Sequence, residues 1–219
     1  MSNLFGTDPA DSKITVAMIS DSLDAVGLRD QVLERRLTGV QPGRRAIGIA
    51  RTARFSPSEI VDPEKPYDDA IDFIDSAQPG DLIVVATNES NISAFWGELF
   101  SAAALGQGAV GMITDGNVRD VDKIVALDFP AFARSHRPID FKGRMRLEVS
   151  QQPVSLGGVN IDPGDLVAVD DDGCVVVPAQ SVPEVLEIAR NRAKAESTVL
   201  TELLEGSTLR EVWTRHGIL

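Results

Sequence analysis

The fold class is decided by residues 82–114, which read LIVVATNESNISAFWGELFSAAALGQGAVGMIT. Within this stretch, Leu82–Thr87 is a run of branched apolar residues that is typical of a buried strand. Gly97–Leu105 follows with the composition of a helix, and glycines come directly after it. Val110–Thr114 is again apolar and strand-like. A strand, a helix and a second strand in this order predict a βαβ step, and with it an α/β protein.

Further elements are expected on both sides of this unit, from apolar periodicity and from the positions of glycine and proline. The expected helices are Lys13–Val26, capped by Asp11 or Ser12, then Asp68–Ala77, Val121–Leu127, Ser181–Leu204 and Leu209–Thr214. The expected strands are Ala46–Ala50, Thr52–Phe55, Phe129–Ala133, Arg146–Gln151, Val154–Gly157 and Leu166–Val177, the last folded back at Asp170–Gly173. No segment has the composition of a linker, so we expect one domain over residues 1–219, with a C-terminal helical extension from about residue 181.

Composition excludes several classes of function. The chain has 219 residues and a formal net charge of −12, whereas a nucleic-acid-binding surface needs clusters of Lys and Arg. No apolar run approaches the roughly 20 residues that cross a bilayer, and the N-terminus has neither a basic nor an apolar leader segment. The single cysteine, Cys174, cannot form an internal disulfide. We therefore expect a cytoplasmic protein that binds neither nucleic acid nor membrane.

Residues 97–120 carry the candidate chemistry. The first amides of the helix that starts at Gly97 have no acceptor within the helix, and glycine lets a ligand approach the backbone. The next strand then delivers Gly116, Arg119 and Asp120 beyond its carboxyl end, where open α/β sheets bind ligands. Helix amides and a guanidinium bind a carboxylate, and an aspartate holds a divalent metal. The pattern therefore points to chemistry on a 2-oxo acid.

The same residues also have a simpler interpretation. Asp115-Gly116-Asn117 is typical of a plain turn. An adjacent Arg–Asp pair is often only a solvated surface feature. Spacing alone leaves the two interpretations open.

Four segments of the chain resemble the 4-hydroxy-4-methyl-2-oxoglutarate aldolase family, which also contains the RraA-like ribonuclease regulators. They are Trp96–Leu99, Asp115–Asp120, Phe129–Arg134 and Gly157–Asp165, and likeness of varying strength extends from about residue 13 to residue 200. The resemblance implies a three-layer β/β/α fold of the swivelling-domain type. It also implies assembly into homotrimers or homohexamers, with sites near the subunit boundaries.

The resemblance also implies a reaction, a retro-aldol cleavage of a 4-hydroxy-2-oxo acid to pyruvate, with oxaloacetate decarboxylation as a related activity. By this resemblance, Asp120 binds the divalent cofactor, Mg²⁺ or Mn²⁺, and Arg119 contacts the pyruvyl oxygen. The acid matching Glu98 orders water on the metal. Both reactions leave an enolate whose negative oxygen a metal and an arginine stabilise, so one site can serve both.

The same resemblance assigns substrate binding to the start of the helix. Gly97 and the backbone amides of Leu99 and Phe100 are expected to hold the carboxylate of a small 2-oxo acid. A glutamate from the C-terminal helix of a neighbouring subunit also belongs to the family's site, reaching the metal through water. Glu196 is the candidate for that glutamate, and a solvated helix position is the alternative interpretation of this residue.

One position departs from the family pattern. Aldolases of this family usually carry an acidic residue three positions after the metal aspartate, where this chain has Lys123. The RraA-like regulators, in contrast, usually lack that aspartate, which this chain keeps as Asp120. The presence of Glu98, Arg119 and Asp120 together favours an enzyme over a non-catalytic regulator that binds a protein partner. An enzyme of the same fold that acts on a different 2-oxo or 3-hydroxy acid is a third interpretation.

Overall fold

The computed structural model describes residues 11–34, 37–60, 62 and 64–218. Contacts within the chain divide it into two compact units. The central unit is formed by residues 30–179, and the helical unit by residues 1–29 together with residues 180–219. The expectation of a single domain over residues 1–219 stays a prediction.

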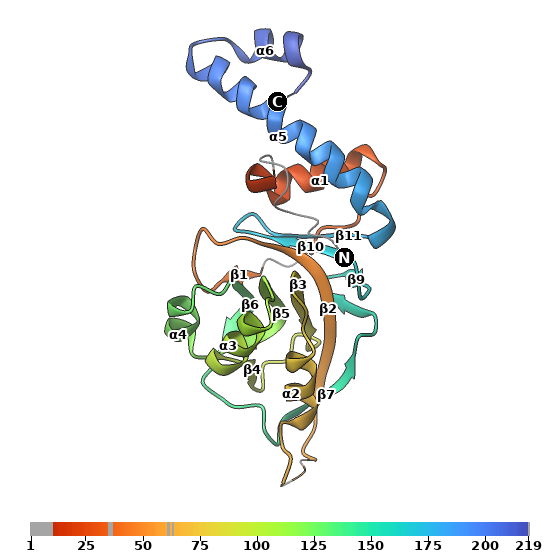
Figure 1. Ribbon diagram of the computed structural model, residues 1–219, viewed down its shortest axis with the longest axis vertical. Helices are drawn as coiled ribbons and strands as arrows, with labels where there is room; N and C mark the ends of the chain where they lie inside the picture. The colour runs from red at the N-terminus through yellow and green to blue at the C-terminus, as the bar shows by residue number, and fades with distance from the viewer. Residues whose placement is uncertain (1–10, 35–36, 61, 63, 219) are drawn as a thin grey trace. The chain divides into compact units, whose positions relative to one another are not determined.

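A mixed sheet forms the centre of residues 30–179 (Figure 1). Among the described residues it has nine strands, seven of them in the order β1-β6-β5-β3-β2-β10-β11, with β4 paired to β5 and β7 paired to β2. Their bounds are β1 Thr38–Gly39, β2 Ala46–Pro57, β3 Asp81–Ala86, β4 Ala94–Trp96, β5 Gly111–Val118, β6 Ala131–His136, β7 Met145–Ser150, β10 Leu166–Val169 and β11 Cys174–Val177. Strands β2, β3, β5 and β6 run parallel, as the βαβ alternation predicts, whereas β1, β7, β10 and β11 pair antiparallel.

The two faces of this sheet bury different layers, because successive side chains of a strand point to opposite sides. The other elements of the unit are helices α2 Asp68–Asp75, α3 Glu98–Gly106 and α4 Val121–Ala126, and the hairpin strands β8 Val154–Leu156 and β9 Val159–Ile161. In β3, Ile83 and Val85 pack in one apolar cluster with all three helices. Leu82 and Val84 pack in a second cluster with the β8–β9 hairpin. The expected three-layer β/β/α architecture is confirmed.

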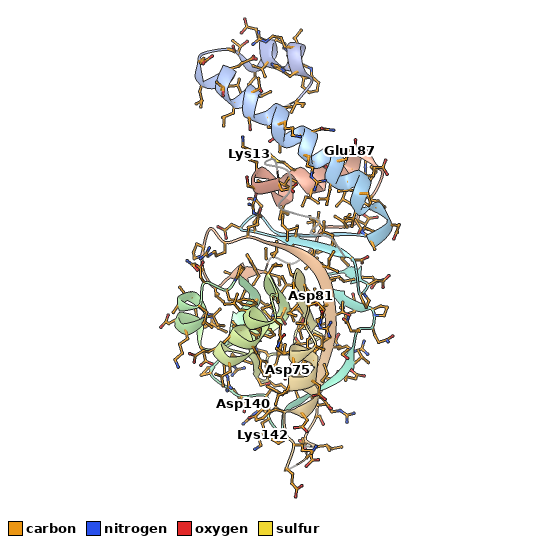
Figure 2. All side chains as sticks on the ribbon, in the orientation of Figure 1. Lys13, Asp75, Asp81, Asp140, Lys142 and Glu187 are labelled. Atoms are coloured by element: carbon orange, nitrogen blue, oxygen red, sulfur yellow. The ribbon has the colours of Figure 1, made fainter. Side chains whose placement is uncertain are left out.

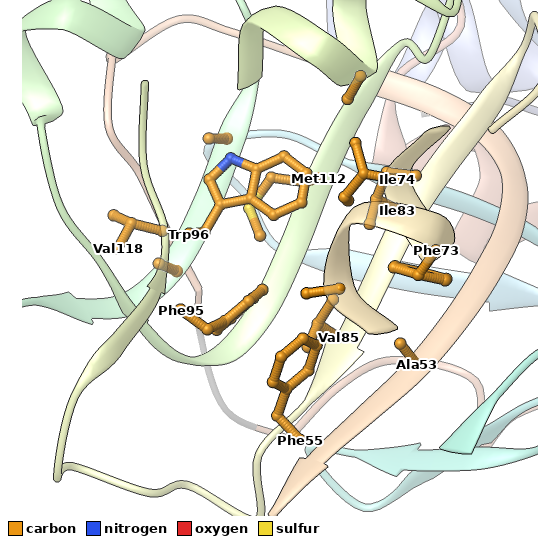
Figure 3. Packing of buried hydrophobic residues seen from close by; sticks show 14 of the residues in the cluster. Ala53, Phe55, Phe73, Ile74, Ile83, Val85, Phe95, Trp96, Met112 and Val118 are labelled. Atoms are coloured by element: carbon orange, nitrogen blue, oxygen red, sulfur yellow. The ribbon is translucent and has the colours of Figure 1, made fainter. Parts of the chain in front are cut away.

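Large aromatic side chains fill the cluster on the helix side of the sheet (Figure 3). Trp96 is fully buried there and stacks on Phe129, with ring centroids 6.2 Å apart. Its ring also meets Phe95 and Phe100 edge-on. Truncating a buried aromatic ring of this kind costs about 3–5 kcal/mol. Trp96 therefore anchors the end of β4, immediately before α3.

The helical unit is built on one long helix. Its elements are the 3₁₀ turn η1 Asp11–Lys13, helix α1 Val16–Ala25, helix α5 Val182–Leu204 and helix α6 Leu209–His216, with the turn η2 Ala179–Ser181 leading into α5. Helix α1 packs along α5, and Leu23, Val185 and Ala189 are among the buried residues of the two helices. Arg190 of α5 also pairs with Asp11 at 2.7 Å. None of the helices in the described part of the chain combines the length and the apolar composition that a bilayer span requires.

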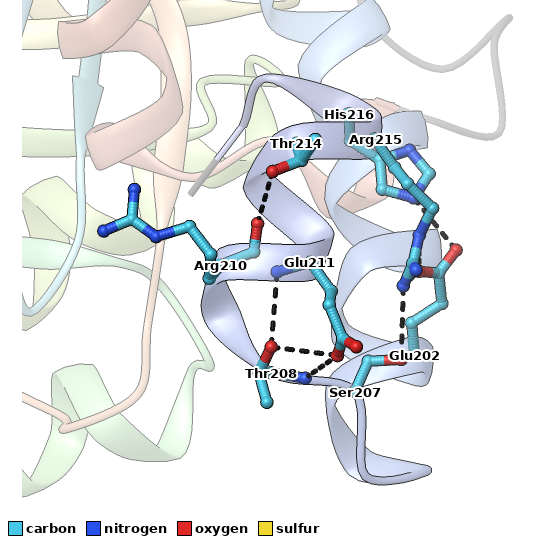
Figure 4. A network of polar contacts seen from close by, with 8 residues as sticks. All are labelled: Glu202, Ser207, Thr208, Arg210, Glu211, Thr214, Arg215 and His216. Carbon is cyan, nitrogen blue, oxygen red and sulfur yellow. Dashed lines mark hydrogen bonds and ion pairs between the residues drawn. The ribbon is translucent and has the colours of Figure 1, made fainter.

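Polar contacts join α6 to the end of α5 (Figure 4). Glu202 Oε2 accepts a hydrogen bond from Arg215 Nη2 at 2.6 Å, and Glu202 Oε1 lies 2.9 Å from His216 Nε2. The hydrogen bond from Arg215 is the main cause that lowers the pKa of Glu202, and the contact with His216 adds to it. Thr208 and Glu211 form a reciprocal capping box at the start of α6.

The cap of the first helix differs from the prediction. Neither Asp11 nor Ser12 caps it, because residues 11–13 form a separate 3₁₀ turn. The helix begins three residues later, and the Thr15 hydroxyl accepts the Met18 amide at 3.2 Å. The apolar periodicity of the sequence predicted this helix correctly. It could not identify the cap, because the cap depends on where the preceding 3₁₀ turn ends.

The second strand of the βαβ step is longer than predicted. Strand β5 continues to Val118, so Gly116 lies inside a strand and not beyond its end, and Asp115-Gly116-Asn117 is not a turn. Two neighbours impose this conformation, because the end of β5 pairs with β4 on one side and with β6 on the other. The short strands β4 and β9 were not predicted, since three residues are too few to show a period.

Candidate active site

The candidate site lies where β4 ends, α3 begins and β5 passes into α4. Gly97 is the N-cap of α3, with an extended backbone (φ −160°, ψ −163°) that any residue adopts. A Cβ on Gly97 would lie 2.6 Å from Asp120 Oδ2 and 3.0 Å from Arg119 Cγ, so a larger residue here would displace the Asp120 side chain. The side chains of Arg119 and Asp120 thus pack directly against the backbone at the start of α3.

Asp120 has an uncommon backbone conformation. Its φ of 57° and ψ of 38° lie in the left-handed region, which few residues other than glycine adopt. Its Oδ2 accepts the Glu98 amide at 3.3 Å and lies 3.8 Å from Arg119 Nε. Aspartate adopts this left-handed conformation more readily than most residues do. In this conformation the Asp120 carboxylate faces the first turn of α3 and remains 42% exposed.

Buried hydrogen bonds fix the start of α3. The Ser101 hydroxyl donates to the Gly97 carbonyl at 3.0 Å and accepts the Trp96 indole N–H at 2.8 Å. The Arg119 amide donates to the Trp96 carbonyl at 2.9 Å, which ties the two strand ends together. Ser101 was not predicted as a residue of the site. It could have been found from its position four residues after Gly97, because a serine hydroxyl in a helix can donate to the carbonyl four residues earlier.

Glu98 and Lys123 form an ion pair at the open edge of the site. Lys123 Nζ lies 2.8 Å from Glu98 Oε2, and the two side chains are 64% and 36% exposed, respectively. The hydrogen bond to Glu98 is the main cause that raises the pKa of Lys123. Lys123, the residue that departs from the family pattern, therefore contacts one of the predicted catalytic residues directly. It stays protonated at neutral pH, so it is a poor nucleophile.

The two residues expected to offer backbone amides differ in their side chains. Leu99 is 78% exposed. Phe100 is half-buried and packs against Trp96 and Phe141, with ring centroids 5.8 and 6.2 Å away. Both residues belong to the first turn of α3, whose amides have no acceptor within the helix and carry the positive end of its dipole. This turn can bind an anion, as predicted for the substrate carboxylate.

A second carboxylate, which sequence analysis did not single out, faces Arg119. Asp140 Oδ1 lies 3.5 Å from Arg119 Nη1, and Asp140 lies in the segment between β6 and β7 (Figure 2). Twenty residues separate it from Asp120 in the sequence, and no local motif marks it. Only the fold brings it to Arg119.

A hollow of about 310 Å³ opens beside the Arg–Asp pair. Its lining residues are Val118, Arg119, Asp120, Val121, His136, Arg137 and Pro138. They come from the carboxyl ends of the parallel strands β5 and β6 and from the first turn of α4. This is the edge of an α/β sheet at which ligands bind, and the volume admits a small organic acid.

Glu196, the last predicted site residue, lies on α5 in the helical unit. Its Oε1 accepts a hydrogen bond from Arg192 Nε at 2.9 Å, one helical turn away. Its expected role in the site of a neighbouring subunit stays a prediction.

The residues at the site fit Mg²⁺ or Mn²⁺ in the chemistry of their donors. Within the described ranges, no group of three or more His, Cys, Asp or Glu residues could hold a metal ion. Mg²⁺ does not need such a cage, because it keeps several waters and binds proteins through one or two carboxylates. Asp120 and Glu98 supply hard oxygen donors of this kind, and the Glu98 amide already contacts Asp120 Oδ2.

These features define a class: a three-layer α/β protein with an arginine and an aspartate at the N-terminus of a helix. The chain belongs to the RraA-like family, because the family model described as Aldolase/RraA matches residues 16–176. The resemblance predicted from the four sequence segments is thereby confirmed.

Curated relatives include both uncharacterized proteins and named aldolases. Protein DlpA of Legionella pneumophila is 31% identical over 195 residues, which are 89% of this chain and 31% of DlpA. An uncharacterized protein of Methanocaldococcus jannaschii is 38% identical over 55% of this chain and 57% of its own length. The chain thus spans less than two thirds of either relative. A Halalkalibacterium halodurans protein, provisionally named 4-hydroxy-4-methyl-2-oxoglutarate aldolase, is 30% identical over 82% of this chain and 80% of its own.

Solved structures of similar proteins have the same fold. An uncharacterized protein from Pseudomonas syringae superimposes with a TM-score of 0.81 at 30% identity, covering 93% of this chain and 94% of the other. Streptomyces coelicolor RraAS2, described as an unusual member of the RNase ES inhibitor RraA family, has a TM-score of 0.76 at 27% identity. That match covers 90% of this chain and 96% of RraAS2. The RraA-like fold is therefore confirmed, while the family contains both named aldolases and named inhibitors.

Proposed function

We propose that this protein is a divalent-metal-dependent lyase that cleaves a 4-hydroxy-2-oxo acid, of the 4-hydroxy-4-methyl-2-oxoglutarate type, to pyruvate. Oxaloacetate decarboxylation is the proposed second activity of the same site. One observation carries the proposal: Arg119 and Asp120 pack within van der Waals distance of Gly97, at the first turn of α3. Anion-binding amides, a guanidinium and a carboxylate thus converge on one point.

Substrate binding follows from the charges at this point. The amides of Leu99 and Phe100 and the helix dipole bind the C1 carboxylate. The Arg119 guanidinium donates a hydrogen bond to the 2-oxo oxygen beside it. The two interactions orient the substrate with its C3–C4 bond toward the hollow beside Asp120.

Bond cleavage places negative charge on the 2-oxo oxygen. The electron pair of the broken C3–C4 bond moves into the C2–C3 double bond of the enolate as C4 becomes a carbonyl, and Arg119 stabilises the developing oxyanion. A proton from water at C3 then converts the enolate into pyruvate. Asp120, with Glu98 beside it, would hold a divalent ion, and such an ion would supply Lewis acidity to the site. Decarboxylation of oxaloacetate produces the same enolate, which is why one site is expected to serve both reactions.

Retro-aldol cleavage also requires a base for the proton of the C4 hydroxyl. Glu98 is the first residue of α3 and its carboxylate is at the site, so we assign it that role through a water molecule. Lys123, at 2.8 Å from Glu98, competes for the same carboxylate. Oxaloacetate has no such hydroxyl proton, so its decarboxylation does not depend on this base.

Assembly belongs to the same proposal. A homotrimer or homohexamer places the C-terminal helix of one subunit near the site of the next, where Glu196 completes the donor set through water. No membrane or nucleic-acid partner is part of the proposed function, and the proposed location is the cytoplasm.

A non-catalytic regulator is the second candidate function. The observation that favours it is Lys123, which stands where aldolases of the family carry an acid and pairs with Glu98. Similarity to RraAS2 adds support. The two candidates differ in whether the purified protein turns over a 2-oxo acid.

The test is pyruvate release, coupled to lactate dehydrogenase, from 4-hydroxy-4-methyl-2-oxoglutarate with Mg²⁺. Asp120→Asn is expected to lower turnover by about 10²-fold or more, because it removes a charge from the enolate-stabilising centre. Asp122→Asn, at an exposed position in the first turn of α4, is the matched control and should retain activity. Full activity in the Asp120→Asn protein would rule out the proposed site.

A further inference from the structure

Arg119 needs support that Asp120 alone does not give. Fixing an arginine side chain in one conformation costs up to about 2 kcal/mol of rotamer entropy, so other contacts must hold the guanidinium in place. The Arg119 side chain is 36% exposed, and its Nε lies 3.8 Å from Asp120 Oδ2. The second ion pair, from Nη1 to Asp140 Oδ1 at 3.5 Å, holds the far end of the guanidinium. Neither pair uses Nη2.

Asp140 is itself held firmly. Its Oδ1 accepts the Phe141 amide at 2.8 Å, and its Oδ2 accepts a hydrogen bond from the Tyr67 hydroxyl. The Asp140 backbone carbonyl accepts a bond from Arg144 Nη1 at 3.0 Å. The backbone next to it pairs with the start of β4, since the Ala94 amide donates to the Ile139 carbonyl at 2.8 Å. Asp140 is therefore connected to β4, the strand that ends immediately before Gly97.

Tyr67 is the donor that orients this carboxylate. Its ring packs edge-on against Phe141, with centroids 5.3 Å apart and an angle of 71° between the planes. The Lys142 ammonium lies over the Tyr67 ring, 6.0 Å from the ring centroid. The hydrogen bond to Asp140 is the main cause that raises the pKa of Tyr67, so the hydroxyl remains a donor at neutral pH. A donor at this point keeps the charge of Asp140 directed at Arg119.

We propose that Asp140, oriented by Tyr67, is a positioning residue that fixes the Arg119 guanidinium so that Nη2 faces the 2-oxo acid. This inference rests on the proposed function, because it assigns Arg119 a substrate. Asp140 does not contact the substrate and acts through Arg119. The segment between β6 and β7 and the residue before α2 thereby become part of the site, although they lie far from it in the sequence.

The test uses oxalate, a planar dicarboxylate that resembles the enolate of pyruvate, and the 219-residue chain with Mg²⁺. Isothermal titration gives its affinity for wild type, Asp140→Asn, Asp140→Glu and Tyr67→Phe, and pyruvate release gives kcat and KM. Asp140→Asn keeps the acceptor for the Phe141 amide but removes the charge. Asp120 and Asp140 both pair with Arg119, so the loss of one charge also affects the other pair. We therefore expect oxalate affinity and kcat to fall about tenfold in Asp140→Asn.

Two further variants separate positioning from structure. Asp140→Glu restores the charge and is expected to recover part of the affinity, and Tyr67→Phe, which keeps the ring, should cost about threefold, as one lost hydrogen bond does. The exposed Asp122→Asn variant is the control and should bind as wild type. Unchanged oxalate affinity in Asp140→Asn, or a loss that follows its Tm and is not rescued by Asp140→Glu, would overturn the inference.

Failure of the inference and failure of the proposed function give different results. If wild type releases no pyruvate but binds oxalate, the proposed reaction fails, and the Asp140 variants still test the positioning of Arg119 through binding. If wild type releases pyruvate and Asp140→Asn does so equally well, only the positioning role fails. If wild type neither binds oxalate nor releases pyruvate, both fail.

Discussion

The two halves of the candidate site are held in different ways. The fixed half comprises Gly97, Arg119, Asp120 and Asp140, which are held by close backbone contacts, by hydrogen bonds to backbone groups and by two ion pairs. The open half is the Glu98–Lys123 pair, in which a single ion pair joins the half-buried Glu98 to the exposed Lys123 across the first turns of α3 and α4. In such a site a substitution of the exposed Lys123 can change proton transfer at Glu98, while the substrate-binding residues keep their positions.

The largest expected effect is in the fixed half, at Gly97. Gly97→Ala would place a Cβ 2.6 Å from Asp120 Oδ2, so the carboxylate must move away from the first turn of α3. We expect turnover to fall by about 10²-fold, the effect of a misplacement near 1 Å. Gly106→Ala is the matched control, since its Cβ meets nothing within 4 Å. Equal kinetics for the two alanine variants would show that the close approach at Gly97 is not needed.

Stability of the fixed half should depend on Ser101. Ser101→Ala removes the acceptor of the buried Trp96 indole N–H and one donor to the Gly97 carbonyl. A buried donor left without a partner costs about 1–3 kcal/mol, and we expect urea denaturation to show a loss of this size. A change below about 0.5 kcal/mol, the usual effect of a surface substitution, would mean that the start of α3 is fixed by other contacts.

The open half should respond by a smaller factor and in the opposite direction. Lys123→Gln removes the cation that competes for Glu98, so kcat for 4-hydroxy-4-methyl-2-oxoglutarate should rise about two- to fivefold, the range of an exposed ion pair. Oxaloacetate decarboxylation should not change, because it needs no base for a hydroxyl proton. Equal effects on both substrates would contradict the role assigned to Glu98.

The raised pKa of Lys123 also predicts a pH dependence. A lysine whose pKa is raised in the folded protein stays charged below its ordinary value of 10.5, and the pair is lost only as the pH rises through the higher value. The ratio of kcat between wild type and Lys123→Gln should therefore be constant from about pH 6 to pH 9. A ratio that changes in this interval would mean that another group controls Glu98.

The smallest effect is expected in the helical unit, at Glu202. Its pKa is lowered, chiefly by the Arg215 hydrogen bond, so its contribution to stability is present above the ordinary glutamate pKa and is lost as the pH falls through the lowered one. Glu202→Gln should lower Tm near pH 7, and the difference should shrink as the pH falls below the ordinary glutamate pKa. Glu205→Gln, at the exposed C-cap of the same helix, is the control. A Tm difference that persists in acid would show that the loss is not electrostatic.

Local patterns in the sequence were enough to predict the alternation of β3, α3 and β5, and the place of Gly97 before a helix. Apolar runs and glycine positions involve only residues that are close in the sequence, so they can be recognised without knowing the fold. The extension of β5 through Asp115-Gly116-Asn117 could not be predicted in that way. The segment has turn residues, and it is strand only because β4 and β6 pair with it.

The same distinction holds for the site: residues close together in the sequence could be predicted, and residues brought together only by the fold could not. Arg119 and Asp120 are adjacent in the sequence, and a single βαβ step brings them to Gly97. Asp140 and Tyr67 could not be assigned, because their contacts depend on how four distant segments fold together. The contact between Lys123 and Glu98 likewise depends on the packing of α3 beside α4, which the sequence of either helix does not specify.

The most direct test of the central claim is the metal dependence of pyruvate release by the wild-type protein. Release from 4-hydroxy-4-methyl-2-oxoglutarate and from oxaloacetate is measured with Mg²⁺, with EDTA, and after Mg²⁺ is added back in excess. The proposed function predicts turnover of both substrates that EDTA abolishes and added Mg²⁺ restores. Turnover that is insensitive to EDTA, or no turnover of either substrate by folded protein, would contradict it.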